Sequence, residues 1–143
     1  MSFHGRNSTG CLASECDIVV LSCALTPETM GLIDGRRLAA MKPSAFLINL
    51  ARGSIAEEQA LYRALRDGVI GGAAIDTWWR YPSPDDPTPR PSDYPFHELA
   101  NVIMTPHCSP RTDGTIKRRS RDVARNIDRF VRGEPRENVV TTT

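Results

Sequence analysis

The stretch LINLARGSIAEEQAL, residues 47–61, contains the pattern that decides the fold. A short apolar run comes first, then Arg52, then a segment with helical spacing of its apolar residues. Residues 45–50 therefore predict a buried strand, and residues 56–68 predict a helix. A permanently charged arginine where an apolar strand ends is explained by recognition of an anion, because a planar guanidinium can bind a carboxylate with two parallel hydrogen bonds.

The same alternation of short apolar runs and helical segments recurs along the chain. A helix start is predicted at Thr26, and a short helix capped by Asp34 follows it. Strands joined by helical crossovers predict the α/β class, here a parallel sheet of about four strands with flanking helices. The other buried strands are expected at residues 18–21, 71–76 and 101–106, and the last helix at residues 113–132.

The composition limits the classes of function. The chain has 143 residues, of which 40% are hydrophobic and 24% charged, as in one globular domain of ordinary size. A net charge of +1 gives no field that favours nucleic acid or a membrane surface. No apolar run has the length of a membrane span, and the N-terminus has no secretion signal, so we expect a cytoplasmic protein. The four cysteines show no spacing typical of metal ligands, and no metal is expected.

Three segments differ in composition. Residues 1–11 are polar, and we expect them to be disordered or vestigial. Residues 12–140 are expected to form the domain. Within it, residues 77–97 contain six prolines and form a long irregular loop, and such loops inside a compact unit are usually functional or mobile.

Polar side chains mark the predicted strand ends. In a parallel sheet, ligands bind beyond the carboxyl ends of the strands. Arg52 could bind a carboxylate, Asp76 could accept a hydrogen bond from a ligand amide, and His107 could act as a general acid or base near neutral pH. Each has a plainer alternative as a surface arginine, a turn aspartate or a structural histidine. The strand-end segments are residues 22–24, 49–53, 76–77 and 105–107.

Five stretches link the chain to a known family. They are CDIVVLSCALTPETMGLI, MKPSAFLINLARGSI, ALYRALRDGVIGGAAID, NVIMTPHCS and NIDRFVRGEPRENVV, and they occur in the family's order and at its spacing. Over residues 12–140 the chain resembles the C-terminal half of the NAD-binding domain of D-isomer-specific 2-hydroxyacid dehydrogenases, which include 3-phosphoglycerate dehydrogenase. The resemblance implies that the predicted sheet is a partial Rossmann-type sheet.

The resemblance implies a role for each matching residue. Arg52 would hold the substrate carboxylate, and His107 would be the general acid and base on the hydroxyl or keto oxygen. Asp76 would bind the nicotinamide carboxamide. The implied cofactor is NAD, with NADP left open, and the substrate is a small 2-hydroxy or 2-keto acid. The residues expected to contact the cofactor are Cys23, Leu50, Ala51, Arg52, Asp76, His107 and Ser109.

The chain departs from the family in two ways. It contains no GxGxxG, so the Gly-rich first βαβ half is lacking, and residues 18–21 are expected to form an exposed apolar edge strand. The family usually has a glutamate five residues after the aspartate that corresponds to Asp76, where this chain has Tyr81. A neutral phenol cannot stabilise an imidazolium at His107 by charge.

Two hypotheses about function follow. In the first, the chain is a fragment of an NAD-dependent oxidoreductase that acts on the CH-OH group of a D-2-hydroxy acid, and it is inactive alone. Its partner would be the missing N-terminal half, or a second copy in a homodimer. In the second, it is a non-catalytic remnant that serves as a protein-interaction or nucleotide-binding module.

Overall fold

The computed structural model describes residues 14–139 of the chain. Residues 1–11, expected to be disordered, lie outside this range. The chain divides into two compact units between Cys108 and Ser109. The first unit contains every strand described, and the second contains one long helix.

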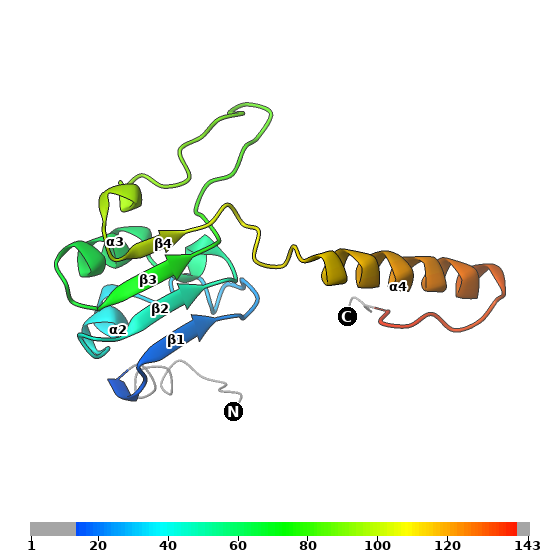
Figure 1. Cartoon of the computed structure of the whole chain (residues 1–143), viewed down its shortest axis with the longest axis horizontal. Coiled ribbons are helices and arrows are strands. Elements are labelled where there is room, and N and C mark those ends of the chain that lie inside the picture. Colours follow the sequence, from blue (N-terminus) through cyan, green and yellow to red (C-terminus); the bar gives the residue numbers. More distant parts are fainter. Residues whose placement is uncertain (1–13, 140–143) are drawn as a thin grey trace. The chain divides into compact units, whose positions relative to one another are not determined.

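The first unit is built on a parallel sheet of four strands (Figure 1). The strand order β1-β2-β3-β4 follows the order of the chain, and β1 lies at one edge, as the sequence predicts. β1 has the predicted bounds, β2 and β3 are two residues shorter than the predicted runs, and β4 is three residues shorter, because the strand ends turn away into loops. Their bounds are Ile18–Leu21 for β1, Phe46–Asn49 for β2, Gly72–Ile75 for β3 and Val102–Met104 for β4.

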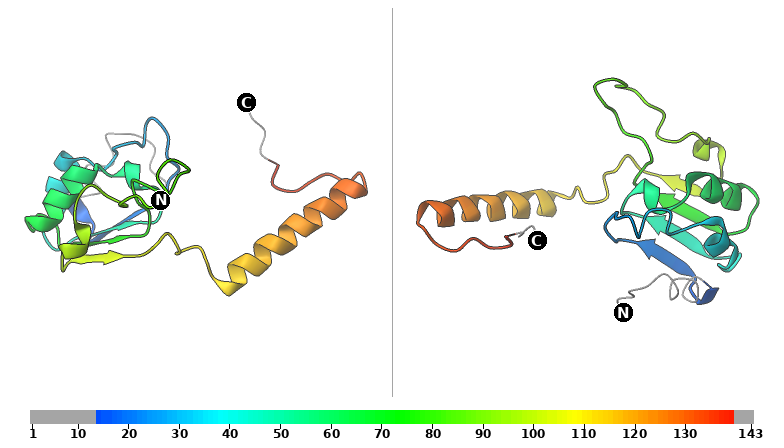
Figure 2. Two further views of the ribbon diagram at one scale, coloured as in Figure 1. Left: turned by 90° about the horizontal axis from the view of Figure 1, so that it is seen from above. Right: turned by 180° about the vertical axis from the view of Figure 1, so that it is seen from behind.

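Two helices cover one face of this sheet (Figure 2). They are α2 (Gly35–Ala39) and α3 (Glu58–Arg66), and two short 3-10 turns, η1 (Gly53–Ile55) and η2 (Phe96–Glu98), lie in the connections. Asp34 caps α2 by accepting a hydrogen bond from the Arg37 amide at 2.7 Å, as predicted. Leu38, Leu61 and Leu65 from these helices are buried in one core with Leu47 and Ile75 from the sheet.

The helix expected to begin at Thr26 is wrong, because residues 27–31 form turns instead. The Thr29 hydroxyl donates to the Ala24 carbonyl at 2.7 Å and accepts from the Thr26 amide at 2.7 Å. Gly31 then takes a left-handed φ of 62°, and its amide donates to the Ser54 carbonyl at 2.9 Å. The backbone therefore leaves the helical path after one turn to pair with the η1 segment.

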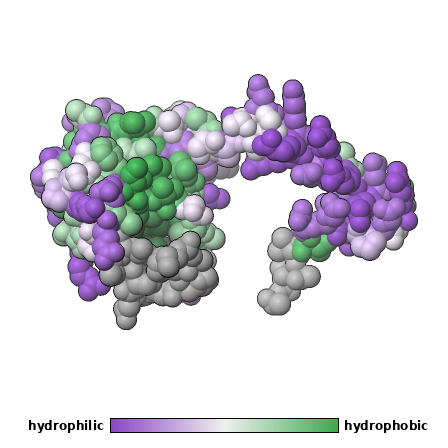
Figure 3. All heavy atoms as spheres, turned by 60° about the horizontal axis from the view of Figure 1, so that its bottom comes forward, coloured by the Kyte–Doolittle hydropathy of each residue, from purple (hydrophilic) through white to green (hydrophobic). Residues whose placement is uncertain are grey.

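Within the described residues of the first unit, no helix covers the opposite face of the sheet. Strand register places Ile18 beside Phe46, and Val20 in one row with Ile48, Ala74 and Ile103. Ile18 is 58% exposed, Phe46 48% and Ile103 67%. An apolar patch on the first unit is visible in Figure 3. Buried sheets of this type usually have helices on both faces, so this face has the character of an interface.

The second unit is formed by α4 (Asp113–Val131), which has the length expected from the sequence. The Thr112 hydroxyl caps its start by accepting from the Thr115 amide at 3.1 Å, and Gly133 ends it with a φ of 69°. Its apolar stripe includes Ile116, Val123 and Ile127, whose side chains are exposed. None of the helices described here has both the length and the apolar character needed to cross a membrane.

Candidate functional site

A cavity lies at the carboxyl ends of β1 and β2. Its volume is about 450 Å³, and Cys23, Leu50, Ala51 and Arg52 all line it. The structure thus brings together four residues that were predicted to contact the cofactor. The Arg52 side chain is exposed, and its Nη1 donates to the Ala51 carbonyl at 2.6 Å, so the guanidinium lies at the cavity wall with donors left for a ligand.

Asn49 fixes the backbone that holds Arg52, and sequence reasoning missed this role. Its side chain is buried at the end of β2. Its amide nitrogen donates to the Arg52 carbonyl at 3.0 Å, and its amide oxygen accepts from the Ala51 amide at 3.1 Å. An asparagine that ends an apolar strand directly before a tight turn was the available signal, because asparagine side chains commonly bond to nearby backbone.

Gly53 brings this turn into direct contact with the segment after β3. A Cβ atom at Gly53 would lie 2.4 Å from the Trp78 carbonyl carbon and 2.7 Å from the Trp79 amide nitrogen. Such distances are well below van der Waals contact, so only glycine fits. The close approach sets the position of Arg52 relative to the segment that contains Asp76 and Trp78.

Asp76 holds the turn that carries His107. The carboxylate is 2% exposed, and its Oδ1 accepts hydrogen bonds from the Thr105 hydroxyl at 2.5 Å and the Cys108 amide at 2.9 Å. Both donors flank His107 in the chain. Hydrogen bonds to a charged carboxylate are stronger than neutral ones, so Asp76 secures the strand end on both sides of the histidine. The predicted contact of Asp76 with a nicotinamide carboxamide stays a prediction.

His107 has an unusual backbone conformation. Its φ of 54° lies in the left-handed region, which non-glycine residues rarely adopt. The half-buried imidazole faces the Tyr81 ring, with ring centroids 5.5 Å apart and a 50° angle between the planes. Strain of this kind is maintained by its surroundings and concentrates at functional sites. Tyr81, which stands where the family usually has a glutamate, therefore lies next to His107, as the resemblance to the family implies.

Ser109 is the one predicted site residue outside the first unit. It is the first residue of the second unit. Its predicted contact with the cofactor stays a prediction. The other six predicted residues all belong to the first unit and lie at or directly after the carboxyl ends of its four strands.

Comparison with known proteins identifies the arrangement. The family model described as D-isomer specific 2-hydroxyacid dehydrogenase, NAD binding domain, matches residues 4–109. The glyoxylate reductase of Korarchaeum cryptofilum is 37% identical over 129 residues, which are 90% of this chain and 37% of that protein. The chain spans between 23% and 39% of the length of the curated relatives that it matches here.

Solved structures agree with the sequence comparison. A D-isomer specific 2-hydroxyacid dehydrogenase from Lactobacillus delbrueckii ssp. bulgaricus, in its NAD complexed form, is 30% identical with a TM-score of 0.80, over 92% of this chain and 42% of that one. One from Xanthobacter autotrophicus Py2, in complex with NADPH and MES, is 34% identical with a TM-score of 0.76, over 97% and 54%. This chain belongs to the D-isomer specific 2-hydroxyacid dehydrogenase family, through its NAD binding domain.

Proposed function

We propose that this chain provides the catalytic strand ends of an NAD-dependent oxidoreductase that acts on the CH-OH group of a D-2-hydroxy acid. The observation that supports this most is the pair of hydrogen bonds that Asp76 accepts from Thr105 and Cys108, which we call the Asp76 clamp. The clamp holds the turn of His107, so that a histidine with a strained backbone lies at the sheet edge that also carries Arg52. A fold that needed these residues only for stability would gain from relaxing the histidine backbone.

The residues at this edge fit a nicotinamide cofactor. The cavity lined by Cys23, Leu50 and Ala51 has a largely uncharged wall and lies beyond the ends of parallel strands, where such cofactors bind. Arg52 is the charged group there. When bound, the nicotinamide would supply or accept the hydride at C2 of the acid. NADP stays open beside NAD, because similar structures contain either one.

The protein's own chemistry has two parts. The Arg52 guanidinium would bind the substrate carboxylate through two parallel hydrogen bonds, which orients the acid. The His107 imidazole would donate a proton to the keto oxygen during reduction and accept it from the hydroxyl during oxidation. The cytoplasmic location and the homodimer expected from the sequence belong to this proposal.

An exchange experiment tests the proposal. Residues 12–140 replace the matching segment of the Korarchaeum cryptofilum glyoxylate reductase, and NADH oxidation with glyoxylate is followed by absorbance. We expect turnover, a fall in kcat of about 10²–10⁴-fold for His107→Ala, and a raised KM for Arg52→Ala. His97→Ala is the matched control, because His97 is an exposed histidine of η2 in the same segment. A folded chimera in which both histidine variants keep the parent rate would contradict the proposal.

The bare sheet face favours a second candidate, a protein-interaction module without turnover. Ile18, Phe46 and Ile103 present an apolar surface on this face. The chimera separates the two candidates, because a non-catalytic module would fold there, bind NADH and show no His107-dependent rate.

A further inference from the structure

A second cavity lies beside His107. It shares no lining residue with the cavity at the ends of β1 and β2. Its volume is about 430 Å³. Its wall comes from the segment after β3, from both limbs of the Pro-rich loop and from the end of β4. Aromatic, proline and methionine side chains dominate this wall. The lining residues include Trp78, Arg80, Tyr81, Pro91, Met104 and His107.

The aromatic wall is held in place by hydrogen bonds. The Trp78 amide donates to the Tyr81 hydroxyl at 3.0 Å, and the Trp78 indole nitrogen donates to the Thr105 carbonyl at 2.9 Å. Both rings are thereby tied to the strand ends. Because Thr105 is itself bonded to Asp76, the wall and the turn of His107 belong to one network.

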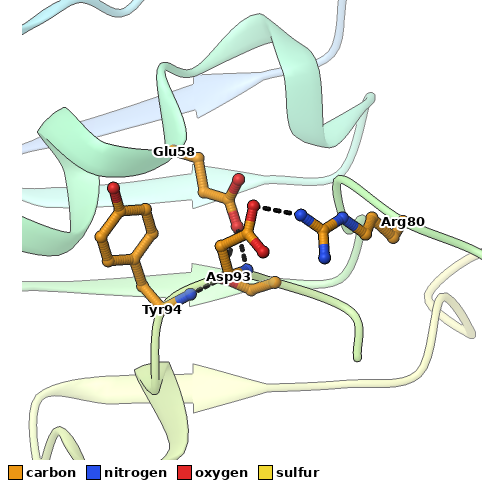
Figure 4. A network of polar contacts seen from close by, with 5 residues as sticks. Glu58, Arg80, Asp93 and Tyr94 are labelled. Atoms are coloured by element: carbon orange, nitrogen blue, oxygen red, sulfur yellow. Dashed lines mark hydrogen bonds and ion pairs between the residues drawn. The ribbon is translucent and has the colours of Figure 1, made fainter. Parts of the chain in front are cut away.

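A separate network fixes the loop that closes the cavity (Figure 4). Glu58, the first residue of α3, accepts from the Ser92 hydroxyl and from the Asp93 amide, each at 2.6 Å. Asp93 forms an ion pair with Arg80, and the Arg80 amide donates to the Pro91 carbonyl at 3.2 Å. The two limbs of the loop are thus tied together at their base, directly next to Tyr81.

This arrangement leaves the cavity without free charge along its described lining. Arg80 is the one permanently charged residue among those that line it, and Arg80 forms an ion pair with Asp93. No carboxylate lines the cavity. Tyr81 is 43% exposed; its hydroxyl accepts a hydrogen bond from the Trp78 amide and keeps its own O–H as a donor, and its ring is part of the cavity wall. A pocket of this kind favours apolar groups, and aromatic groups most, because ring pairs add to the gain from burial.

We propose that this cavity receives the side chain of the 2-hydroxy acid and that it selects an aromatic or similarly bulky apolar side chain. The inference rests on the proposed function: His107 lines the cavity, so an acid whose C2 oxygen bonds to His107 would have its C3 substituent near this wall. Tyr81 is then a specificity-determining residue. A carboxylate in its place would put a negative charge on the wall and disfavour an apolar group.

Two acids that differ in one group test this with the chain itself. D-3-phenyllactate and D-lactate share the carboxylate and the hydroxyl, and the phenyl ring is their difference. The chain has two tryptophans, Trp78 and Trp79, so quenching of tryptophan fluorescence reports on the cavity wall. We expect D-3-phenyllactate to bind at least about tenfold more tightly than D-lactate.

Two variants of one residue make the test specific. Tyr81→Phe keeps the ring and should keep the preference, whereas Tyr81→Glu should reduce it to less than about threefold. A preference that survives in Tyr81→Glu would overturn the inference, because the ring would then bind elsewhere. Equal affinities for both acids, lost in Arg52→Ala, would overturn it and leave the proposed function intact. Binding of neither acid would also overturn it, and the chimera would then decide the proposed function separately.

Discussion

The left-handed backbone conformation of His107 leads to a prediction about stability. It separates the effect of backbone strain from the effect of losing the imidazole. We compare His107→Gly with His107→Ala, which both remove the imidazole and its contact with the Tyr81 ring. The two variants therefore differ mainly in how they tolerate a φ of 54°. Alanine must occupy a region that is disfavoured for residues with a Cβ atom, while glycine enters it freely.

The magnitude follows from two opposing terms. The left-handed conformation costs a residue with a Cβ atom about 1–2 kcal/mol. Glycine loses about 0.5–1 kcal/mol relative to alanine through its greater freedom in the unfolded chain. At the middle of these ranges, we expect His107→Gly to exceed His107→Ala in free energy of unfolding by about 0.75 kcal/mol, which corresponds to about 3–6 °C in Tm for a unit of this size.

Urea denaturation followed by tryptophan fluorescence measures the difference, since Trp78 and Trp79 lie in the same unit as His107. Equal slopes of the unfolding free energy against urea would show that both variants unfold from the same compact state. Equal stability of the two variants, or greater stability of the alanine variant, would refute the strain argument. The Asp76 clamp would then have no strained backbone to maintain.

Three further predictions concern the same strand ends, and urea denaturation measures each of them. Asp76→Asn should lower the free energy of unfolding by about 1–2 kcal/mol, because the hydrogen bonds from Thr105 and Cys108 then no longer go to a charged acceptor. In a double-mutant cycle, Asp76→Asn and Thr105→Val should be coupled, and strictly additive effects on stability would count against the clamp. Thr77→Val should raise the free energy of unfolding by about 1 kcal/mol, because the Thr77 hydroxyl is buried without a partner in the described part of the chain; a loss of stability would reveal a partner. Gly53→Ala should lower the free energy of unfolding by about 1–3 kcal/mol, because its Cβ would meet the next segment's backbone at 2.4 Å; an unchanged midpoint would contradict the close approach.

The sequence predicts the sheet well because its signals are local. Each strand is a short apolar run, and Gly68 ends α3 with a φ of 68°, as its position after the helical pattern indicates. The turn at Thr26 was mispredicted for the same reason. Threonine followed by proline is a typical helix start, but the competing partner of this segment is the backbone of Ser54, which lies far along the chain.

The residues of the site could be predicted from the sequence, but the hydrogen bonds that hold them could not. The rule for parallel strand ends selects Arg52, Asp76 and His107 without any contact being known. The bond from Thr105 to Asp76 joins residues 29 positions apart, and His107 with its left-handed conformation lies two residues after Thr105. Neither the bond nor the conformation can be predicted from the local sequence pattern. The Glu58 bonds to the Pro-rich loop span 34 and 35 positions and were equally hidden.

The strand order of the first unit has a consequence for how it folds. Each strand after β1 pairs with the strand that precedes it in the chain, so each crossover links neighbouring strands of the sheet. Every crossover contains a helix or a long loop, so each pairing first has to close a long connection, which is a slow step. Because His107 follows β4, we expect the histidine turn to form only after β4 has paired with β3. If β4 pairs slowly during refolding, ligand binding would recover later than secondary structure, because binding needs the histidine turn.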